Sequence, residues 1–473
     1  MIRRPPRSTQ GVSSAASDVY KRQPIILVTL TLFLQTHAAA PPRTRRAKPA
    51  KAQPLTPPRP PAEVEPCPHA PDCPSCTIDG GFDEVDTARR ARAMFEPLLD
   101  KPFEIICGSA KDWRTQARLA CAPGATKLTA RGRRGRKTYR LRDVALGLYR
   151  PRSHDVVAIP DCRTHHPLLN KAAGEIKEAC AVVGIKALDS EGDGDLRYVQ
   201  LSTDGNKVAL TLVWNERSAK EAQPELPRLV KELSGSDLWH SIHVNYRGDK
   251  AGNAIFDYNP QKWAKLRGET YAIERLFDDD VVDLDAQLKL WFTPLTFRQA
   301  NLRAFAGLVE KLAKWVPDDS HVCELYAGVG AIGLALRPKL ASLRCSETNP
   351  SVLDCFEKSK RDQESRLEDL CPVEMTVADA EDAVHEDCAG ADLLIVDPPR
   401  KGLCEGVREA LVKGELDVKR LVYVSCGFDA LERDQAALLN SRRWKLTHAE
   451  AHVFFPGSDH VETLAVYDAV SPE

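Results

Sequence analysis

Short apolar segments alternate with helix-like segments from about residue 291 onward, and this alternation limits the folds open to the chain. Each apolar segment has the length and composition of a buried strand, and the segments between them have helical spacing of apolar residues. Such alternation is typical of a parallel, doubly wound α/β sheet. The expected strands are His321–Tyr326, Ser342–Ser346, Ala391–Val396 and Leu421–Ser425, and the expected helices are Phe305–Trp315, Ala331–Leu336 and Ser351–Ser359.

A glycine-rich segment, Glu324–Gly333, follows the first of these strands and opens a helix. Glycines such as Gly328 and Gly330 let the backbone approach a bound nucleotide closely. Glu347 follows the next strand, where its carboxylate can accept hydrogen bonds from ribose hydroxyls. Dinucleotide-dependent dehydrogenases show the same glycine pattern, and so do tight turns that bind no ligand. The segment therefore favours a nucleotide-type cofactor without identifying it.

The segment Asp397-Pro398-Pro399-Arg400 comes directly after a third strand. Two prolines fix a stiff loop that lacks backbone N–H groups, so the loop can hold Asp397 against a cofactor or base with little entropic loss. A simple turn is the plain alternative. Asp-Pro-Pro also occurs in amino-group methyltransferases, where an aromatic residue usually follows, whereas Arg400 follows here.

A thiol and a carboxylate are the candidates for covalent chemistry. Cys426 ends the apolar strand 421–425, and Glu462 lies near the C-terminus. A single cysteine is more often an inert core residue, and a single glutamate is more often a surface residue. The ends of parallel strands meet at one edge of a sheet, however, so Glu347, Asp397 and Cys426 are expected together there. This favours Cys426 as a nucleophile and Glu462 as a proton acceptor.

Cys67, Cys73 and Cys76 have the spacing C-x5-C-x2-C between prolines. Three thiols within so short a segment favour zinc or an iron–sulfur cluster over chance. A fourth ligand must come from far away in the sequence, and the candidates are Cys107, Cys121 and Cys162. The other cysteines are scattered, as expected for buried thiols in a reducing cytoplasm.

The chain of 473 residues carries a net charge of -1, but residues 1–65 carry +8 and the remainder about -9. A nucleic-acid partner must then be met by local basic patches. The best patch is the Arg-rich run 131–137, although a solvated loop explains that run equally well. Residues 80–290 mix helical and strand signals and form an expected α+β domain. Its expected elements are a helix at Thr87–Leu99 and strands at Val156–Ile159, Tyr198–Ser202 and Val208–Trp214.

Residues 1–66 differ in composition from the rest of the chain. Residues 25–34 are apolar and resemble the core of a secretory signal peptide, but they are too few to span a bilayer. Residues 1–23 resemble translated sequencing-adapter sequence, which favours a spurious start over an export signal. Residues 41–66 are rich in Pro, Ala and Arg and are expected to be a disordered linker.

In combination, these motifs resemble the bacterial RNA 5-methyluridine methyltransferases, the uracil-carbon-5 family that acts on 23S ribosomal RNA or transfer RNA. The resemblance runs from about Pro66 to Tyr467, and the order of its motifs is more specific than any one of them. These motifs are Phe297-x-Gln299-x-Asn301, Gly328-x-Gly330, Glu347, Asp397-Pro-Pro-Arg400, Ser425-Cys426, Glu432-Arg433-Asp434 and His460-Val461-Glu462.

The resemblance implies a class I S-adenosylmethionine (SAM)-dependent methyltransferase, with a Rossmann-like doubly wound sheet over residues 291–473. It also implies a smaller α+β RNA-binding domain at 80–290 and an iron–sulfur loop at 66–79. The cofactor would be held by Gln299, Tyr326, Gly328, Gly330, Glu347, Asp379 and Asp397. Cys426 matches the family nucleophile and Glu462 its general base. The ribosomal branch carries a [4Fe-4S] cluster, which Cys67, Cys73, Cys76 and Cys162 would hold, with zinc as the alternative.

The implied function is methylation of carbon 5 of a uridine in 23S rRNA, with tRNA as the alternative, by a cytoplasmic monomer that does not contact membranes. An NAD-dependent oxidoreductase and a catalytically silent RNA-binding protein are the alternatives from other classes. Two positions depart from the family pattern. Gly427-Phe428 stands where Asn-Pro usually follows the nucleophile, which is expected to loosen that turn. Ala331 occupies a position that is often polar, so one hydrogen bond to the cofactor is expected to be missing.

Overall fold

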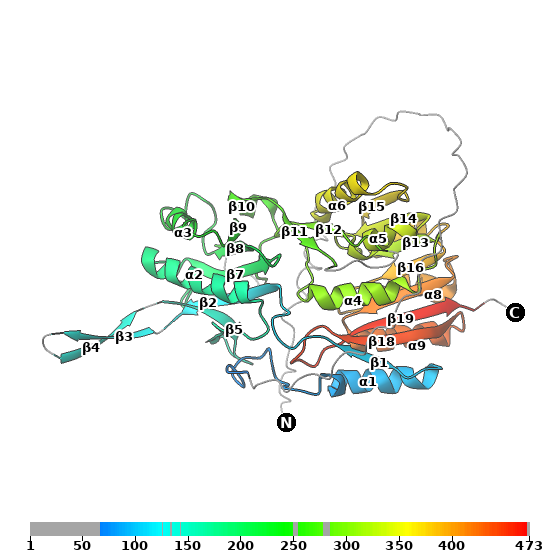
Figure 1. Ribbon diagram of the computed structural model, residues 1–473, viewed down its shortest axis with the longest axis horizontal. Coiled ribbons are helices and arrows are strands. Elements are labelled where there is room, and N and C mark those ends of the chain that lie inside the picture. The colour runs from blue at the N-terminus through cyan, green and yellow to red at the C-terminus, as the bar shows by residue number, and fades with distance from the viewer. Residues whose placement is uncertain are drawn as a thin grey trace, which may run out of the picture.

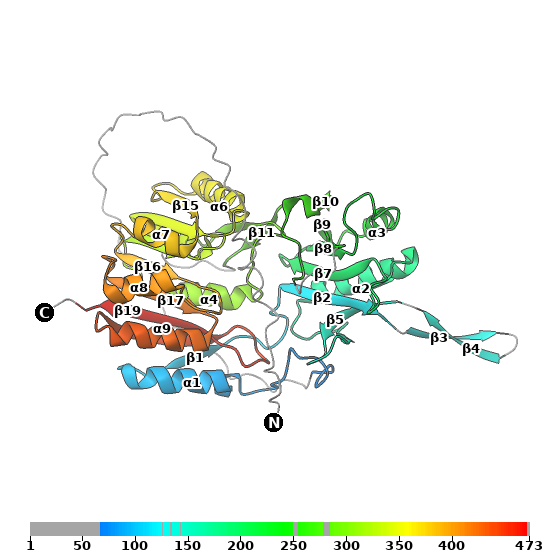
Figure 2. The same cartoon turned by 180° about the vertical axis from the view of Figure 1, so that it is seen from behind.

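The computed structural model describes residues 67–124, 126–132, 135–141, 143–248, 254–277 and 284–470, and it shows two lobes side by side (Figures 1 and 2). Each lobe contains one large β-sheet with helices against it. The segments 1–23, 25–34 and 41–66, expected to be an adapter-like start, a signal-peptide-like run and a linker, lie outside the described residues.

The larger lobe contains the expected α/β sheet. In spatial order its strands are β1 (Glu104–Cys107), β18 (Trp444–Val453), β19 (Glu462–Ala469), β17 (Arg420–Ser425), β16 (Leu393–Val396), β13 (His321–Leu325), β14 (Ser342–Glu347) and β15 (Val373–Val377). Neighbouring strands are parallel except that β19 runs antiparallel to β17 and β18. The four strands expected from the sequence are parallel, as predicted, and the antiparallel strand β19 is an addition that the sequence did not predict. A short loop joins β18 to β19, and a parallel pair would need a long crossover.

Helices cover both faces of this sheet because successive residues of each strand face opposite sides. Val322 belongs to one apolar core and Cys323 to the other, and Leu394 and Ile395 divide in the same way. One face carries α4 (Leu302–Ala313), α5 (Ala331–Leu336), η4 (Arg337–Lys339) and α6 (Val352–Arg366). The other carries η1 (Phe82–Glu84), α1 (Asp86–Phe95), η2 (Glu96–Leu98), α7 (Ala380–Asp387), α8 (Glu405–Lys413) and α9 (Phe428–Asn440).

The first elements of the described chain join this larger sheet. β1 pairs in parallel with β18, and α1 packs against α9 and β18. A division of the chain at residue 80 therefore does not separate the two lobes, because residues 86–107 belong with the larger one. Sequence patterns within a segment do not reveal such pairing with strands more than 300 residues away.

The smaller lobe contains a mixed sheet with helices on one face. Its strand order is β10 (Trp263–Gly268), β9 (Trp239–Tyr246), β8 (Val208–Trp214), β7 (Leu196–Thr203), β2 (Gln116–Pro123), β5 (Val144–Tyr149) and β6 (Val156–Ala158). The helical elements of this lobe are α2 (Pro167–Val183), α3 (Glu225–Leu233) and η3 (Pro260–Lys262). The antiparallel pair β3 (Thr126–Gly132) and β4 (Gly135–Leu141) projects away from the body (Figure 1). The Arg-rich run falls at this tip, where the side chains lie outside the described residues.

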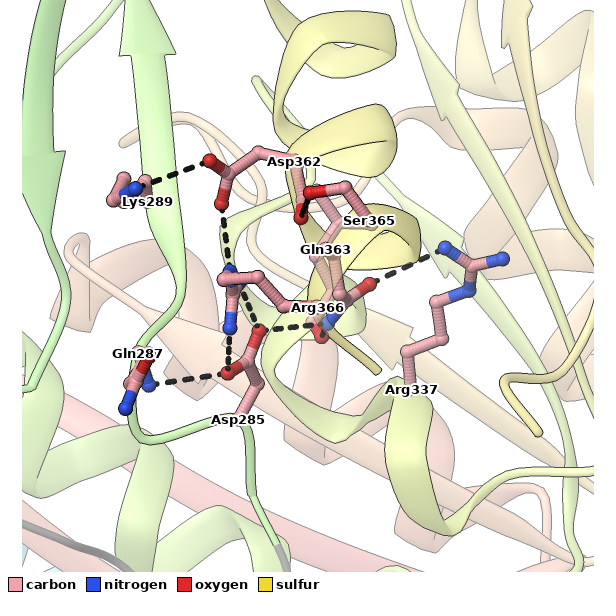
Figure 3. Close-up of polar contacts among 9 residues, drawn as sticks. Asp285, Gln287, Lys289, Arg337, Asp362, Gln363, Ser365 and Arg366 are labelled. Atoms are coloured by element: carbon pink, nitrogen blue, oxygen red, sulfur yellow. Dashed lines mark hydrogen bonds and ion pairs between the residues drawn. The ribbon is translucent and has the colours of Figure 1, made fainter. Parts of the chain in front are cut away.

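A connecting segment links the lobes through the antiparallel pair β11 (Ala272–Arg275) and β12 (Lys289–Phe292). A buried polar network holds it against α6 (Figure 3). Asp285 accepts hydrogen bonds from Arg366 at 2.8 and 3.1 Å and from Gln363 Nε2 at 3.2 Å. Lys289 pairs with Asp362 on the same helix at 3.1 Å. Because Asp285 is only 4% exposed, these partners satisfy a carboxylate that would otherwise be costly to bury.

Candidate active site

The glycine-rich turn after β13 contains three residues in the left-handed backbone region. Tyr326, Gly328 and Gly330 all have positive φ, at 61°, 57° and 76°. A Cβ atom at Gly330 would lie 2.6 Å from the ring of Phe356, so glycine is required there for packing as well as for conformation. The turn therefore brings backbone N–H groups to the edge of the sheet where α5 begins.

Glu347 lies beside this turn at the end of β14. Its Oε2 atom accepts a hydrogen bond from Gly328 N and its Oε1 atom one from Asn349 N, both at 3.0 Å. The neighbouring Thr348 donates from its hydroxyl to Asp379, an exposed residue just before α7, at 3.0 Å. Two carboxylates predicted as cofactor contacts thus lie on adjacent strand ends.

Glu324 is a buried carboxyl group in the same region that the sequence did not single out for a role. It is 1% exposed, and its Oε2 atom accepts from Gly333 N at 2.8 Å. The pKa of Glu324 is raised to about 8, mainly by burial and also by the negative charges of Asp397 and Glu347. Its position within a buried strand is the signal that could have identified it.

Asp397 follows β16, and its pKa is raised to about 7 by burial and by the negative charge of Glu347. Cys426 follows the adjacent strand β17, and its Sγ atom lies 4.0 Å from the carbonyl oxygen of Pro398. Burial raises the pKa of Cys426 to about 12, with added contributions from the negative charges of Glu462 and Asp397, while Arg400 lowers it. The thiol is therefore protonated in the free protein.

Glu462 opens β19, which is antiparallel to β17. Ser425 pairs with Thr463, so the next residues along each strand, Cys426 and Glu462, meet at the end of the strand pair. Glu462 is 9% exposed. Its pKa is raised to about 8, mainly by burial and also by the negative charge of Asp397, while Arg400 opposes the rise. The structure thus brings together the predicted nucleophile, the predicted base and Asp397.

The remaining predicted residues Gln299 and Tyr326 both lie outside helices and strands. Gln299 lies in the loop between β12 and α4, two residues before Asn301, which caps α4. The hydroxyl of Tyr326 accepts a hydrogen bond from Cys404 N at 3.1 Å and donates to Cys404 Sγ at 3.2 Å. This contact ties the glycine turn to the loop that follows Asp397.

The predicted metal ligands Cys67, Cys73, Cys76 and Cys162 are all buried, and they are close enough to interact electrostatically. The pKa of Cys76 is raised to about 11, mainly by burial and also by the charges of the other three cysteines. For Cys162, hydrogen bonds and positive charge from His165 outweigh burial and lower the pKa to about 6. The other two candidates for fourth ligand, Cys107 and Cys121, lie on β1 and β2.

Across the described part of the chain, no group of three or more His, Cys, Asp or Glu side chains is arranged to hold a metal ion. The four thiols are close enough to influence one another's pKa values, but these described residues do not form a metal site in the structure. In the same residues, no helix is long and apolar enough to cross a membrane.

The comparisons with known proteins agree on a class of enzyme. No protein-family model matches the chain. An uncharacterized RNA methyltransferase of Protochlamydia amoebophila is 32% identical over 409 residues, covering 85% of this chain and 97% of that protein. An uncharacterized RNA methyltransferase of Oceanobacillus iheyensis is 26% identical over 330 residues, covering 68% of this chain and 67% of that protein.

Among solved structures, the tRNA (uracil-54, C5)-methyltransferase of Pyrococcus abyssi in complex with S-adenosyl-L-homocysteine superimposes with a TM-score of 0.61. It is 20% identical and covers 84% of this chain and 86% of its own. The fold is therefore that of the class I SAM-dependent methyltransferases, as predicted. The chain belongs to the RNA methyltransferases. This membership sets aside the alternative of an NAD-dependent oxidoreductase.

Proposed function

We propose that this protein transfers a methyl group from SAM to carbon 5 of a uridine in RNA, with Cys426 as nucleophile and Glu462 as general base. The observation that carries the proposal is the meeting of Cys426, Glu462 and Asp397 at the ends of β17, β19 and β16. A thiol beside a buried carboxyl suits a reaction that needs both covalent addition and proton removal.

The residues around the glycine turn fit the proposed cofactor. Gly328 and Gly330 would let the cofactor approach the backbone closely, and the carboxylate of Glu347 would accept hydrogen bonds from its ribose hydroxyls. Asp379, bonded to the neighbouring Thr348, lies near enough to contact the adenine side. Gln299, Tyr326 and Asp397 would contact the rest of the SAM molecule. When bound, SAM would supply the methyl group and a sulfonium cation, which would lower the pKa of the nearby acidic groups.

Nearby charges and burial determine the protonation states of Cys426 and Glu462 before the reaction begins. In the free protein Cys426 is a thiol and Glu462 has a raised pKa, because two carboxyl groups and burial disfavour more negative charge. After its proton has passed to solvent water, the Cys426 thiolate would add to carbon 6 of the base, leaving an enolate whose carbon 5 takes the methyl group. Glu462 would then remove the proton from carbon 5. The bond between Cys426 Sγ and carbon 6 breaks, and the thiolate returns.

The four buried cysteines have the number and the C-x5-C-x2-C spacing that the family resemblance implies for a [4Fe-4S] cluster, and we propose that they hold one, with zinc as the alternative. The lowered pKa of Cys162 favours the thiolate form that any metal ligand must have. The cluster loop also contacts the site, since Thr77 N and Ile78 N donate to Gly457 O at 2.8 and 3.1 Å.

Two RNAs are candidate substrates. The cysteine spacing favours 23S rRNA, whereas the Pyrococcus neighbour is named for a tRNA uridine. Phe297 is 66% exposed next to the segment that carries Gln299, and an exposed aromatic side chain can stack on an unpaired base. We propose a cytoplasmic, monomeric enzyme that acts on one of these two RNAs.

Nucleoside analysis tests the proposal. Unmodified 23S rRNA and tRNA transcripts would be incubated with the purified protein and SAM, digested, and analysed by mass spectrometry. We expect 5-methyluridine in one of the two RNAs. A methyl group on another atom would overturn the proposed chemistry, and SAM binding without turnover on either RNA would favour a catalytically silent RNA-binding protein.

A further inference from the structure

Asn301, the last residue of the motif Phe297-x-Gln299-x-Asn301, is a buried residue to which the proposed reaction assigns no role. It is 3% exposed. Its Oδ1 atom accepts a hydrogen bond from Ala304 N at 3.1 Å, which caps α4. Its Nδ2 atom donates to the carbonyl oxygen of Phe454 at 2.8 Å. This one side chain therefore joins the start of α4 to the residue that follows β18.

These two hydrogen bonds fix the orientation of the Asn301 amide. If its oxygen and nitrogen exchanged places, the NH2 group would face the N–H of Ala304 and the oxygen would face the carbonyl group of Phe454. Both bonds would then be lost, and a buried polar group without a partner is costly. The amide is therefore held in one orientation between the two segments.

Phe454 lies close in the sheet to the proposed general base. In the antiparallel pair of β18 and β19, His452 is opposite Glu462, so Phe454 is two residues beyond the partner of the base. The loop 454–461 then leads back to Glu462. This loop is also tied to α1, because Thr87 N donates to Asp459 Oδ1 at 2.8 Å. Asn301 is thus one anchor of the loop that carries the base.

The chain before α4 is anchored on both sides of Gln299. Arg298 is 5% exposed and forms an ion pair with Glu274. The carbonyl oxygen of Ala300 accepts a hydrogen bond from Thr115 N at 2.8 Å. Between these anchors, the side chain of Gln299 makes no hydrogen bond with any residue that the structure describes. Its amide is therefore available to the cofactor, next to backbone that is firmly held.

We propose that Asn301 is a positioning residue that couples binding of SAM to placement of the general base. SAM at Gln299 would restrict the motion of residues 299–301, and the hydrogen bond from Asn301 to Phe454 would extend this restraint to the loop that leads to Glu462. The inference rests on the proposed function for the roles of Gln299 and Glu462. It adds the contact through which the bound cofactor holds the base in place.

Hydrogen exchange, measured by mass spectrometry on the full-length protein, tests this coupling without requiring methyl transfer. In wild type, SAM should slow the exchange of backbone amides in residues 454–461 roughly ten-fold. In Asn301→Ser, the hydroxyl can still cap α4 but is too short to reach Phe454 as well. We expect this variant to bind SAM with a Kd within about three-fold of wild type, because Ser and Asn are similarly good caps. SAM should no longer protect its loop.

Asn259→Ser is the matched control. Asn259 caps η3 in the smaller lobe by accepting a hydrogen bond from Gln261 N at 3.0 Å, and its replacement should leave the SAM-dependent protection unchanged. In methylation assays, Asn301→Ser should lower kcat roughly ten-fold, because the base is less well positioned. Its KM for SAM should stay near that of wild type, because the cofactor contacts remain.

The absence of SAM-dependent protection in wild type, or equal protection in Asn301→Ser, overturns the inference. A joint loss of SAM affinity and of the urea unfolding midpoint in Asn301→Ser overturns it too, because the residue would then only stabilise α4. A protected loop in wild type without methylation of uridine would instead overturn the proposed reaction and leave the coupling in place.

Discussion

The carbonyl oxygen of Arg400 lies so close to Gly427 that a Cβ atom at position 427 would be 2.2 Å from it. Gly427 directly follows the proposed nucleophile, and Arg400 closes the Asp-Pro-Pro-Arg loop. The lack of a side chain at position 427 therefore lets the two segments that carry Cys426 and Asp397 pack in direct contact. Gly427 was expected to loosen this turn, but the structure shows a tight packing contact instead.

Substitution at this contact should impair catalysis. Gly427→Ala must push the Arg400 backbone away and shift Asp397 relative to Cys426, so kcat/KM should fall roughly ten- to a hundred-fold. Gly307→Ala in α4 is the matched control because its Cβ would have no neighbour within 4 Å. Steady-state methylation assays on both variants check this, and unchanged activity of Gly427→Ala would contradict it.

Asp434 anchors the far end of the same loop to α9. It is 0% exposed and accepts hydrogen bonds from Leu403 N and Tyr423 Oη, both at 2.9 Å, and from Arg433. Asp434→Asn replaces the buried carboxylate that accepts these hydrogen bonds with an amide that cannot accept all of them, so the free energy of unfolding should fall by about 2 kcal/mol. Urea titration measures this. Glu409→Gln, at an exposed ion pair on α8, should leave the unfolding midpoint unchanged.

The sequence predicted the larger lobe well because its signals are local. Buried strands such as β13 and β16 are apolar runs, and the glycine turn and Asp-Pro-Pro segment have backbone requirements visible in their own residues. α4 begins at Leu302, earlier than predicted, because Asn301 caps it with its side chain. The pairing of β1 with β18 and the role of Asp434 could not be predicted, because each depends on residues distant in sequence.

The rate of methylation should depend on pH through the buried carboxyl groups. Glu462 must be ionised to accept a proton, and burial raises its pKa to about 8, so kcat/KM should rise between about pH 6 and pH 9. Asp397 titrates nearby, so the apparent pKa belongs to the pair. A pH–rate profile that is flat, or that falls across this range, would contradict the assignment of Glu462 as the base.

The four thiols should behave as one site. Anaerobically purified wild-type protein should contain iron and acid-labile sulfide, and Cys76→Ser or Cys162→Ser should lose both. Activity should also fall, because Thr77 and Ile78 bond to Gly457 in the loop that leads to Glu462. Cys107→Ser is the matched control and should keep the iron. Zinc in place of iron would contradict the cluster, as would iron retained in Cys162→Ser.

The central claim is that Cys426 forms a covalent bond to the substrate base and that Glu462 is needed to release it. Glu462→Gln would be incubated with RNA and SAM and analysed on a denaturing gel and by intact mass spectrometry. We predict a stable protein–RNA adduct carrying the added methyl group, and no adduct in the double variant Cys426→Ala/Glu462→Gln. An adduct in the double variant, or full methylation activity in Cys426→Ala, would contradict the account.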